Sequence, residues 1–429
     1  MRCTRLDNRS FLFLQGVASP FFAKLASALN QAGVQTCKIE FCGGDALFNG
    51  SNCLKGFTDK PERLSSFYRE VFDELKVSDI VLFGDTRPIH IPAITIAKKL
   101  GINIHVYEEG YLRPDWITLD SGGVNGFSPL VGKTPNYFRR RAKDIPRGIE
   151  SLKTNYSQWV RLYYDLRFNT ARISDSFRFP HYTRHRADHP LREYLGWVKR
   201  YPALVPLSLG AKYKINKIID DKLSYYVYPL QLSGDSQIRV HSPFDDVNQA
   251  TVKILQSFAK NAPKNTKLVV KNHPLDTGLS KCKEYTLRVS KDLGIEKRVI
   301  FIDGGHLPTL LQHAKGTVLI NSTTGMSALF HKSPTIALGD ALYNMPGLTF
   351  QGGLDQFWRR AKKSDYNLFR DFRDVVINDT QINGNFYTKK GIEMAVAESL
   401  KRFNATIQEP ITVECQSSMP VMNFDVSTT

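Results

Sequence analysis

The sequence predicts an α/β protein made of two Rossmann-like, doubly wound domains that face a cleft, with a basic, aromatic helical insertion. The first observation is that short apolar runs alternate with amphipathic stretches near the start of the chain and again after residue 223, as in parallel β-α units. The second is that these runs end in glycine-rich or polar turns. Such turns meet at the carboxyl edge of a parallel sheet, where open α/β folds bind their ligands.

In the first half, apolar runs predict strands over 11–15, 34–41, 80–83 and 104–107. The amphipathic stretches between them predict helices over 20–31, 62–75 and 89–100. Gly101 follows the last of these helices at the position where glycine ends a helix. We expect residues 1–138 to form the N-terminal, acceptor-side domain.

The second half repeats the rhythm, with strands predicted over 225–230, 267–270, 298–302, 317–320 and 334–338. A helix over 246–259 has Asp245 or Asp246 as its cap. We expect a second Rossmann-like domain over 223–389, a closing helix over 390–404 and a weakly ordered tail over 405–429.

Residues 139–222 lie between the halves and are strongly basic. They hold 19 Lys and Arg and 8 Asp and Glu, and so carry +11 of the formal charge of +17. Aromatic residues are interleaved with the charges, and prolines are expected to break the segment into short helices or loops. The composition suits an anionic membrane interface or nucleic-acid stacking, and an ordinary solvated helical face is the alternative.

Several classes of protein are disfavoured. No run approaches the roughly 18 apolar residues of a spanning helix, so membrane contact is expected to be peripheral. The apolar run over 11–14 is interpreted as a buried strand and not as a targeting sequence. GxGxxG, P-loop and HExxH patterns are absent, which argues against a dinucleotide oxidoreductase, a P-loop kinase and a zinc protease. No cofactor or metal is predicted, and the scattered cysteines suit a reducing cytoplasm.

The strand over 104–107 leads directly into paired acids. Glu108 and Glu109 precede Gly110, and Arg113 follows three residues later. Acids delivered to a glycine turn at a strand end are candidate catalytic groups. A solvated turn with an ion pair is the alternative reading of this stretch.

Two turns of the second half suit an anionic ligand, and a third presents a carboxylate. Asn321, Ser322, Thr323 and Thr324 would offer an amide, hydroxyls and free helix N–H groups to a phosphate, although Ser and Thr also cap helices. Lys271 and His273 follow another strand, and Asp235 follows Gly234 in a third turn. Each feature alone has a structural explanation, but all are predicted at one edge of one sheet.

These strings together resemble a known family. The matching strings are Phe13-Leu14-Gln15-Gly16, Phe41-Cys42-Gly43-Gly44-Asp45, Glu108-Glu109-Gly110-Tyr111-Leu112-Arg113-Pro114-Asp115, Gly122-Gly123-Val124-Asn125-Gly126, Asp235-Ser236-Gln237-Ile238 and Lys271-Asn272-His273-Pro274. They resemble the bacterial capsule polysaccharide biosynthesis proteins of the KpsS/LipB type, which are related to KpsC. The resemblance covers residues 10–360 of the chain.

The resemblance implies a GT-B glycosyltransferase that forms a β-linkage with retention. Its donor would be CMP-Kdo, where Kdo is 3-deoxy-D-manno-oct-2-ulosonic acid, and its acceptor phosphatidylglycerol or the lyso form. The product would start the poly-Kdo linker of a capsule. The implied setting is the cytoplasmic face of the inner membrane, beside a KpsC-type extending transferase and the capsule export complex, with no nucleic-acid partner.

By analogy with retaining glycosidases, Asp235 is assigned as the nucleophile and Glu109 as the general base, with Glu108 as the alternative base. Lys271 and His273 would hold the CMP phosphate, and Ser322, Thr323 and Thr324 the same phosphate or the cytidine. Arg113 would pair with the Kdo carboxylate or orient Glu109. Gln15, Gly16, Gln231 and Asn321 are further substrate-binding candidates, and the resemblance makes residues 223–389 the CMP-sugar-binding domain. A CMP-sialic-acid transferase and a non-catalytic membrane scaffold are the competing interpretations.

Overall fold

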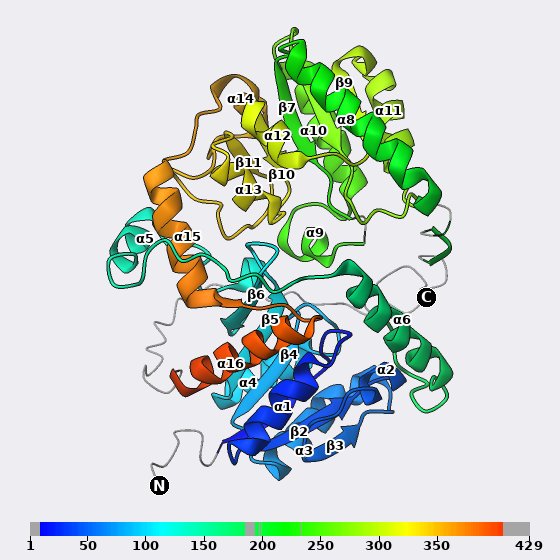
Figure 1. Cartoon of the computed structure of the whole chain (residues 1–429), viewed down its shortest axis with the longest axis vertical. Helices are drawn as coiled ribbons and strands as arrows, with labels where there is room; N and C mark the ends of the chain where they lie inside the picture. Colours follow the sequence, from blue (N-terminus) through cyan, green and yellow to red (C-terminus); the bar gives the residue numbers. More distant parts are fainter. Residues whose placement is uncertain (1–8, 185–193, 197, 199, 233, 406–429) are drawn as a thin grey trace.

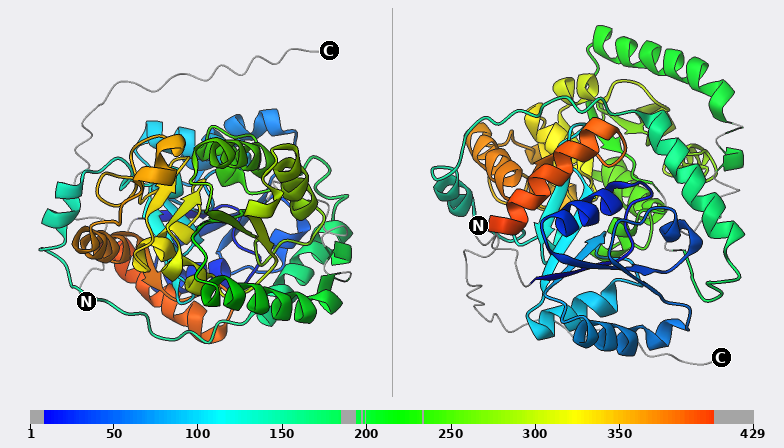
Figure 2. Two further views of the ribbon diagram at one scale, coloured as in Figure 1. Left: turned by 90° about the horizontal axis from the view of Figure 1, so that it is seen from above. Right: turned by 60° about the horizontal axis from the view of Figure 1, so that its bottom comes forward.

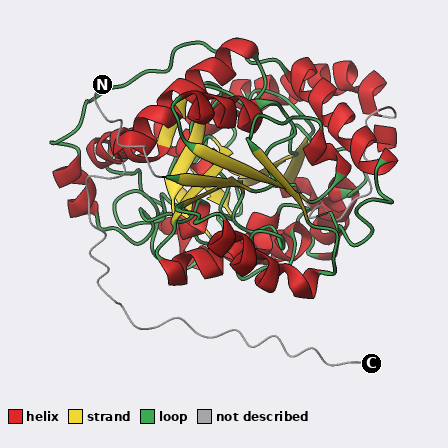
Figure 3. Cartoon of the chain, turned by 90° about the horizontal axis from the view of Figure 1, so that it is seen from below, coloured by secondary structure: helices red, strands yellow, loops and turns green. Residues whose placement is uncertain are grey.

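The computed structural model describes residues 9–184, 194–196, 198, 200–232 and 234–405. The chain forms two β-sheets, one above the other in Figure 1, and helices enclose the strands of both (Figure 3). The predicted GT-B-like α/β fold is confirmed.

The first sheet has the strand order β12-β6-β5-β4-β1-β2-β3. Its strands are β1 (Ser10–Phe13), β2 (Gln35–Glu40), β3 (Cys53–Gly56), β4 (Asp79–Phe83), β5 (Asn103–Glu109), β6 (Trp116–Ser121) and β12 (Gln381–Asn383). The five strands from β5 to β3 are parallel, whereas β6 and β12 pair antiparallel. The carboxyl ends of β1, β4 and β5 are therefore neighbours.

Helices cover both faces of this sheet. Apolar side chains of α1 (Phe21–Gln31) and α16 (Lys389–Ala405) form the core on one face, where the two helices lie along each other (Figure 2). Side chains of α3 (Leu64–Glu74) and α4 (Ile91–Leu100) form the core on the other. The short helix η1 (Pro61–Arg63) precedes α3, and η2 (Asn125–Phe127) follows β6. Gly101 ends α4 in the left-handed region, as predicted.

The second sheet is entirely parallel, in the order β11-β10-β7-β8-β9. Its strands are β7 (Tyr225–Pro229), β8 (Lys267–Lys271), β9 (Val299–Ile302), β10 (Gly316–Leu319) and β11 (Thr335–Ala337). Its helices are α9 (Ser236–His241), α10 (Val247–Asn261), α11 (Cys282–Asp292), η4 (Glu296–Arg298), α12 (Leu307–His313), α13 (Thr324–Phe330) and α14 (Leu354–Arg360). Asp246, and not Asp245, caps α10 by accepting the N–H of Gln249 at 2.8 Å.

Within the basic segment, the expectation of short helices is wrong. The segment begins in α5 (Pro135–Arg141) and contains α6 (Gln158–Ser174), η3 (Tyr201–Ala203) and α8 (Leu204–Asp220). Two of these helices run for 17 residues, because α6 contains no proline and Pro206 lies in the first turn of α8, where proline is tolerated. The two long helices, α6 and α8, also pack on different halves of the molecule. α6 packs on α2 (Gly43–Ala46) in the first half, whereas α8 buries Ala211, Ile215 and Ile218 against the second sheet.

After the second sheet the chain returns to the first one. α15 (Tyr366–Thr380) packs on α5, and β12 pairs with β6 before α16 begins. The crossover therefore precedes residue 389, where the sequence placed the end of the second domain. The closing helix predicted over 390–404 is present as α16. Of the tail predicted over 405–429, residue 405 is the last residue of α16, and residues 406–429 lie outside the described residues.

Candidate functional site

Glu108 and Glu109 are the last two residues of β5, so their side chains leave opposite faces of the sheet. Both are paired with β6, Glu108 with Thr118 and Glu109 with Ile117, which continues the strand beyond the predicted end at residue 107. Gly110 follows because the carbonyl of Trp116 leaves no room there for a side chain. The acids therefore have fixed and different surroundings.

Glu109 is held by two partners. Its carboxylate lies 3.1 Å from the guanidinium of Arg161 on α6, and its Oε1 accepts a hydrogen bond from the Tyr387 hydroxyl at 3.3 Å. The Arg161 guanidinium also lies over the Tyr387 ring. The two contacts hold the Glu109 carboxyl group in one position at the end of β5.

Glu108 lies deep in the protein while keeping partial solvent access. Burial raises its pKa to about 7, and the nearby carboxyls of Glu109 and Asp85 add to the shift. The N–H of Glu109 donates to it at 2.9 Å, and the Arg87 charge opposes the shift. Its Oε2 lies against Gly84, the first residue after β4. A carboxyl with a pKa near neutrality can both take up and release a proton.

Gln15 and Gly16 follow β1 beside these acids. Gln15 is almost completely buried, and its side chain bonds with Arg87 at 3.0 Å, Asp45 at 3.1 Å and the Tyr182 hydroxyl at 3.2 Å. The Gly16 carbonyl accepts a second bond from Arg87 at 3.2 Å. The two predicted substrate-binding residues thus hold the Arg87 guanidinium in place beside Glu108.

His273, directly after β8, has a defined tautomer. Its Nδ1 accepts the backbone N–H of Leu275 at 3.1 Å, so the ring proton resides on Nε2. Burial lowers its pKa to about 4, and the charges of Arg113 and Lys271 lower it further. The ring is therefore neutral at pH 7 and presents an Nε2–H donor.

The side chains of Lys271 and Asn272, which precede His273, are buried. Lys271 is almost fully buried, and burial lowers the pKa of its ammonium group. The Asn272 amide donates to Asp276 at 2.9 Å and to Asp303 at 3.1 Å. Arg200, directly before η3, pairs with the same two carboxylates. The basic segment therefore helps to hold the His273 turn.

Asp235 caps α9, and a hydrogen-bonded chain joins it to the next strand. Its Oδ1 accepts the N–H of Gln237 at 3.0 Å, and its Oδ2 accepts the Gln231 amide at 3.3 Å. The same Gln231 amide donates to Asn321 at 3.0 Å. Asn321 in turn donates to backbone carbonyls of Gln237 and His241. Gln231 and Asn321 therefore position Asp235 and α9.

Ser322, Thr323 and Thr324 lie at the start of α13 and are partly exposed. The Ser322 hydroxyl accepts the N–H of Thr324 at 3.2 Å, which is a local helix cap. The Tyr343 hydroxyl donates to the Ser322 carbonyl at 2.7 Å and fixes the turn from the other side.

Two contacts join the halves near these turns. Arg113, after β5, lies close enough to His273 for its charge to depress the imidazole pKa. The His241 ring at the end of α9 lies 4.5 Å from the Phe127 ring in η2, and α9 lies between the two sheets in Figure 1. The structure thus brings Arg113 to His273 and sets Asp235 at the junction, while Glu108 and Glu109 stay on the first sheet.

Sequence reasoning assigned no role to five residues of the site. These residues are Asp85, Arg87, Arg161, Arg200 and Tyr387. The Gly-Asp turn after β4 was a usable signal for the first two. Asp85 is buried, its pKa is raised to about 6 by burial, and its Oδ1 has no hydrogen-bond partner in the described part of the chain. The other three come from distant segments, and no local pattern marks them.

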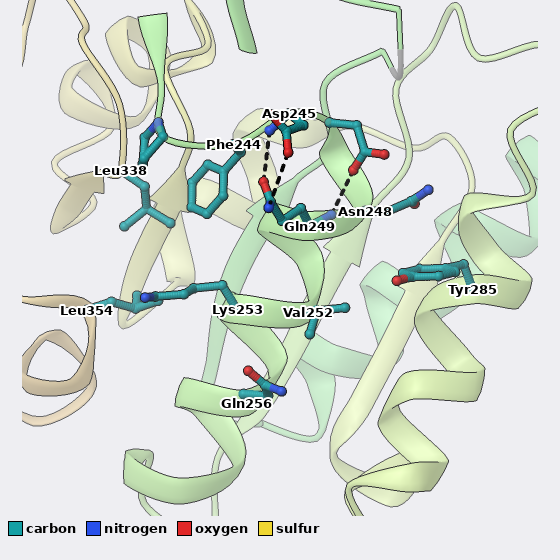
Figure 4. A pocket seen from close by; sticks show the side chains of 12 residues that line it. Phe244, Asp245, Asn248, Gln249, Val252, Lys253, Gln256, Tyr285, Leu338 and Leu354 are labelled. Carbon is teal, nitrogen blue, oxygen red and sulfur yellow. Dashed lines mark hydrogen bonds between the residues drawn. The ribbon is translucent and has the colours of Figure 1, made fainter. Parts of the chain in front are cut away.

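One groove of the structure lies away from the predicted site. It has a volume of about 900 Å³ and runs along α10, between Tyr285 of α11 and Leu354 of α14, and none of the predicted site residues lines it (Figure 4). In the described ranges no three His, Cys, Asp or Glu side chains gather as a metal site. No helix in that part of the chain is long and apolar enough to cross a bilayer.

Comparison with known proteins gives consistent matches. Residues 78–387 match the family model described as capsule polysaccharide biosynthesis protein. The chain is 34% identical over 384 residues to the capsule polysaccharide export protein KpsS of Escherichia coli, covering 89% of this chain and 98% of that protein. It is 32% identical over 400 residues to the capsule polysaccharide modification protein LipB of Neisseria meningitidis serogroup A, covering 89% and 92%.

A more distant likeness is found among solved structures. KpsC of Thermosulfurimonas dismutans, described as a beta Kdo 2,7 transferase, aligns with a TM-score of 0.43 and 13% identity. The alignment covers 92% of this chain and all of the KpsC chain.

Proposed function

The chain belongs to the family of capsule polysaccharide biosynthesis proteins, and we propose that it is a retaining β-Kdo glycosyltransferase. It transfers Kdo from CMP-Kdo to phosphatidylglycerol or its lyso form and so starts the poly-Kdo linker of a capsule. The donor and acceptor come from the family resemblance, and the site geometry is compatible with both.

The observation that carries the proposal is that Arg113 lies near enough to His273 for its charge to lower the pKa of the imidazole. This proximity brings the loop that follows the paired acids to the turn that offers a neutral imidazole donor. A sugar phosphate between these turns would meet the Nε2–H of His273 and the Arg113 guanidinium. Acids on one side and phosphate donors on the other are what transfer from a nucleotide sugar requires.

The reaction proceeds by two displacements. The Asp235 carboxylate attacks C2 of Kdo, the bond from C2 to the phosphate oxygen breaks, and CMP departs with the electron pair. His273 and Lys271 stabilise the charge on the departing phosphate. The acceptor hydroxyl then loses its proton to the base and attacks C2, which releases Asp235. Two inversions at C2 leave the configuration retained.

The geometry favours Glu108 over Glu109 as the base. A general base works best when its pKa is near the working pH, and the pKa of Glu108 is raised to about 7. The Glu109 carboxylate is already engaged by Arg161 and Tyr387. In this proposal Glu109 holds Arg161, and Arg87 orients the acceptor or the Kdo carboxylate beside Glu108.

The acceptor lipid places the enzyme at the cytoplasmic face of the inner membrane. A KpsC-type transferase would extend the product before export. Neither the KpsC-type transferase nor the export machinery is needed for the first transfer, so the purified chain is sufficient for a test.

The test measures CMP release by the purified protein with CMP-Kdo or CMP-sialic acid, each with and without phosphatidylglycerol. We expect lipid-dependent release from CMP-Kdo alone. Release from CMP-sialic acid but not from CMP-Kdo would assign the chain to the sialic-acid alternative. The absence of release from either donor would favour a non-catalytic scaffold.

A further inference from the structure

The outer face of α6 is apolar and uncovered. Its exposed apolar side chains fall on one side of the helix, with an interval of seven residues between Leu166 and Ile173, and continue just past its end. They are Trp159, Leu162, Tyr163, Leu166, Ile173 and Phe177. Trp159 is 67% exposed and Phe177 is 82% exposed. A contiguous apolar stripe on a surface helix is a feature that usually marks a contact surface.

The opposite face of the same helix is fixed to the protein. The Phe168 ring lies against Gly44, the Ala171 carbonyl lies against Gly43, and Arg161 reaches Glu109 at 3.1 Å. The apolar stripe is therefore not the packing face of α6. It is held outward by a rigid attachment on the other side.

The stripe continues toward α8. The Trp159 ring lies 6.5 Å from the ring of Tyr201, which begins η3 directly before α8. Val205, Leu209 and Tyr213 then follow at intervals of four residues on the exposed side of α8. Because α6 packs on the first half and α8 on the second, the two helices lie along both halves of the molecule (Figures 1 and 2).

Positive charge accompanies the apolar side chains. The exposed Arg167 lies beside Tyr163, with its guanidinium over that ring, and the exposed Lys212 and Lys217 lie on α8. The acids on α6 are engaged, since Asp165 accepts the Tyr194 hydroxyl and Asp175 pairs with Arg178. Aromatic, aliphatic and basic side chains on one face fit an anionic lipid interface. Nucleic acid would use the aromatic and basic residues but not Leu162, Leu166 and Ile173.

We propose that this outer face, formed by the exposed stripes of α6 and α8 with Tyr201 between them, docks on an anionic phospholipid surface. The proposal deepens the proposed function, because an enzyme that modifies a membrane lipid must take it from a bilayer. With α6 lying on the membrane, Arg161 and Glu109 are about one helix diameter, roughly 10 Å, from the lipid headgroups. The same helix then contacts the membrane with one face and the site with the other.

The test uses the full chain and sedimentation with vesicles of phosphatidylglycerol mixed with phosphatidylcholine, or of phosphatidylcholine alone. We expect binding to the anionic vesicles only. The double variant Trp159→Ser/Phe177→Ser should bind them about tenfold or more weakly. A matched double variant, Leu100→Ser/Phe330→Ser, changes two exposed apolar residues outside this face and should bind as the wild type does.

Equal binding to both vesicle types, no binding, or unchanged binding by the Trp159/Phe177 variant would overturn the proposal. Melting temperatures of both variants confirm that they fold. Turnover with detergent-dispersed phosphatidylglycerol should be the same for the Trp159/Phe177 variant and the wild type, since that acceptor needs no docking. Vesicle binding without any Kdo transfer would contradict the proposed function and leave the docking face standing.

Discussion

The Arg161 guanidinium on α6 lies 3.1 Å from the Glu109 carboxylate at the end of β5. This ion pair gives two adjacent glutamates different surroundings. Glu109 is engaged by a neighbouring cation, while Glu108 has a pKa of about 7 on the opposite face of the strand. Different surroundings of paired carboxyls are how enzymes divide structural and proton-transfer roles between them.

The first prediction separates the two acids. Glu108→Gln should lower the turnover rate by about 10²–10⁴-fold, because it removes the proposed base while keeping the shape of the side chain. Glu109→Gln should lower it by less, since its carboxylate acts through Arg161. Initial rates of CMP release measure both. A larger loss in Glu109→Gln would return the role of base to Glu109.

The second prediction concerns pH. A base must be ionised to accept a proton, so kcat/KM should rise with pH up to about 7 and level off above it. His273 adds no limb near neutral pH because its pKa is lowered to about 4. The rising limb should disappear from the residual activity of Glu108→Gln. A limb that persists in this variant belongs to another group and contradicts the assignment.

The third prediction separates capping from catalysis at Asp235. Asparagine caps a helix as well as aspartate does, so Asp235→Asn should change the free energy of unfolding by less than about 0.5 kcal/mol. Asp235→Ala should cost about 0.5–2 kcal/mol. Both should lose about 10³-fold or more in kcat, because neither has a carboxylate nucleophile. Full activity in Asp235→Asn would show that the residue serves the helix alone.

The fourth prediction tests the attachment of α6. A Cβ on Gly43 would lie 2.5 Å from the Ala171 carbonyl and 2.4 Å from the Asp175 Cβ. Gly43→Ala should therefore destabilise the protein by about 1–3 kcal/mol, as overpacking does. Gly210→Ala is the matched control, since nothing lies within 4 Å of that position in α8. It should stabilise the protein by up to about 1 kcal/mol. Denaturant titration compares the two, and equal stability would refute the packing argument.

Much of the fold was predictable because its central strands are apolar runs with turns at their ends. Apart from the omitted β3, β6 and β12, the strands agree with the prediction to within two residues at either end. β3, β6 and β12 were not predicted. β3 and β12 are short edge strands, which are defined by their pairing and not by their own pattern, and β6 lies between β5 and β12 as their antiparallel partner. The extension of β5 through Glu109 has the same cause, because β6 supplies the partners.

The site was predictable only as far as its turns. Glu108, Glu109, Asp235, Lys271 and His273 all lie at strand ends or in the turns that follow strands, and that position marks them. The difference between Glu108 and Glu109 depends on Arg161 and Tyr387, which lie 52 and 278 positions beyond Glu109 along the chain. A contact of this range leaves no trace in a local pattern.

The most direct test of the central claim is the structure of the product. The purified protein is incubated with CMP-Kdo and phosphatidylglycerol, and the lipid is analysed by mass spectrometry and then by NMR. We predict a lipid that carries Kdo in the β configuration of the donor. An α-linked product would contradict retention, and an unmodified lipid would contradict the assignment of the chain as a Kdo transferase.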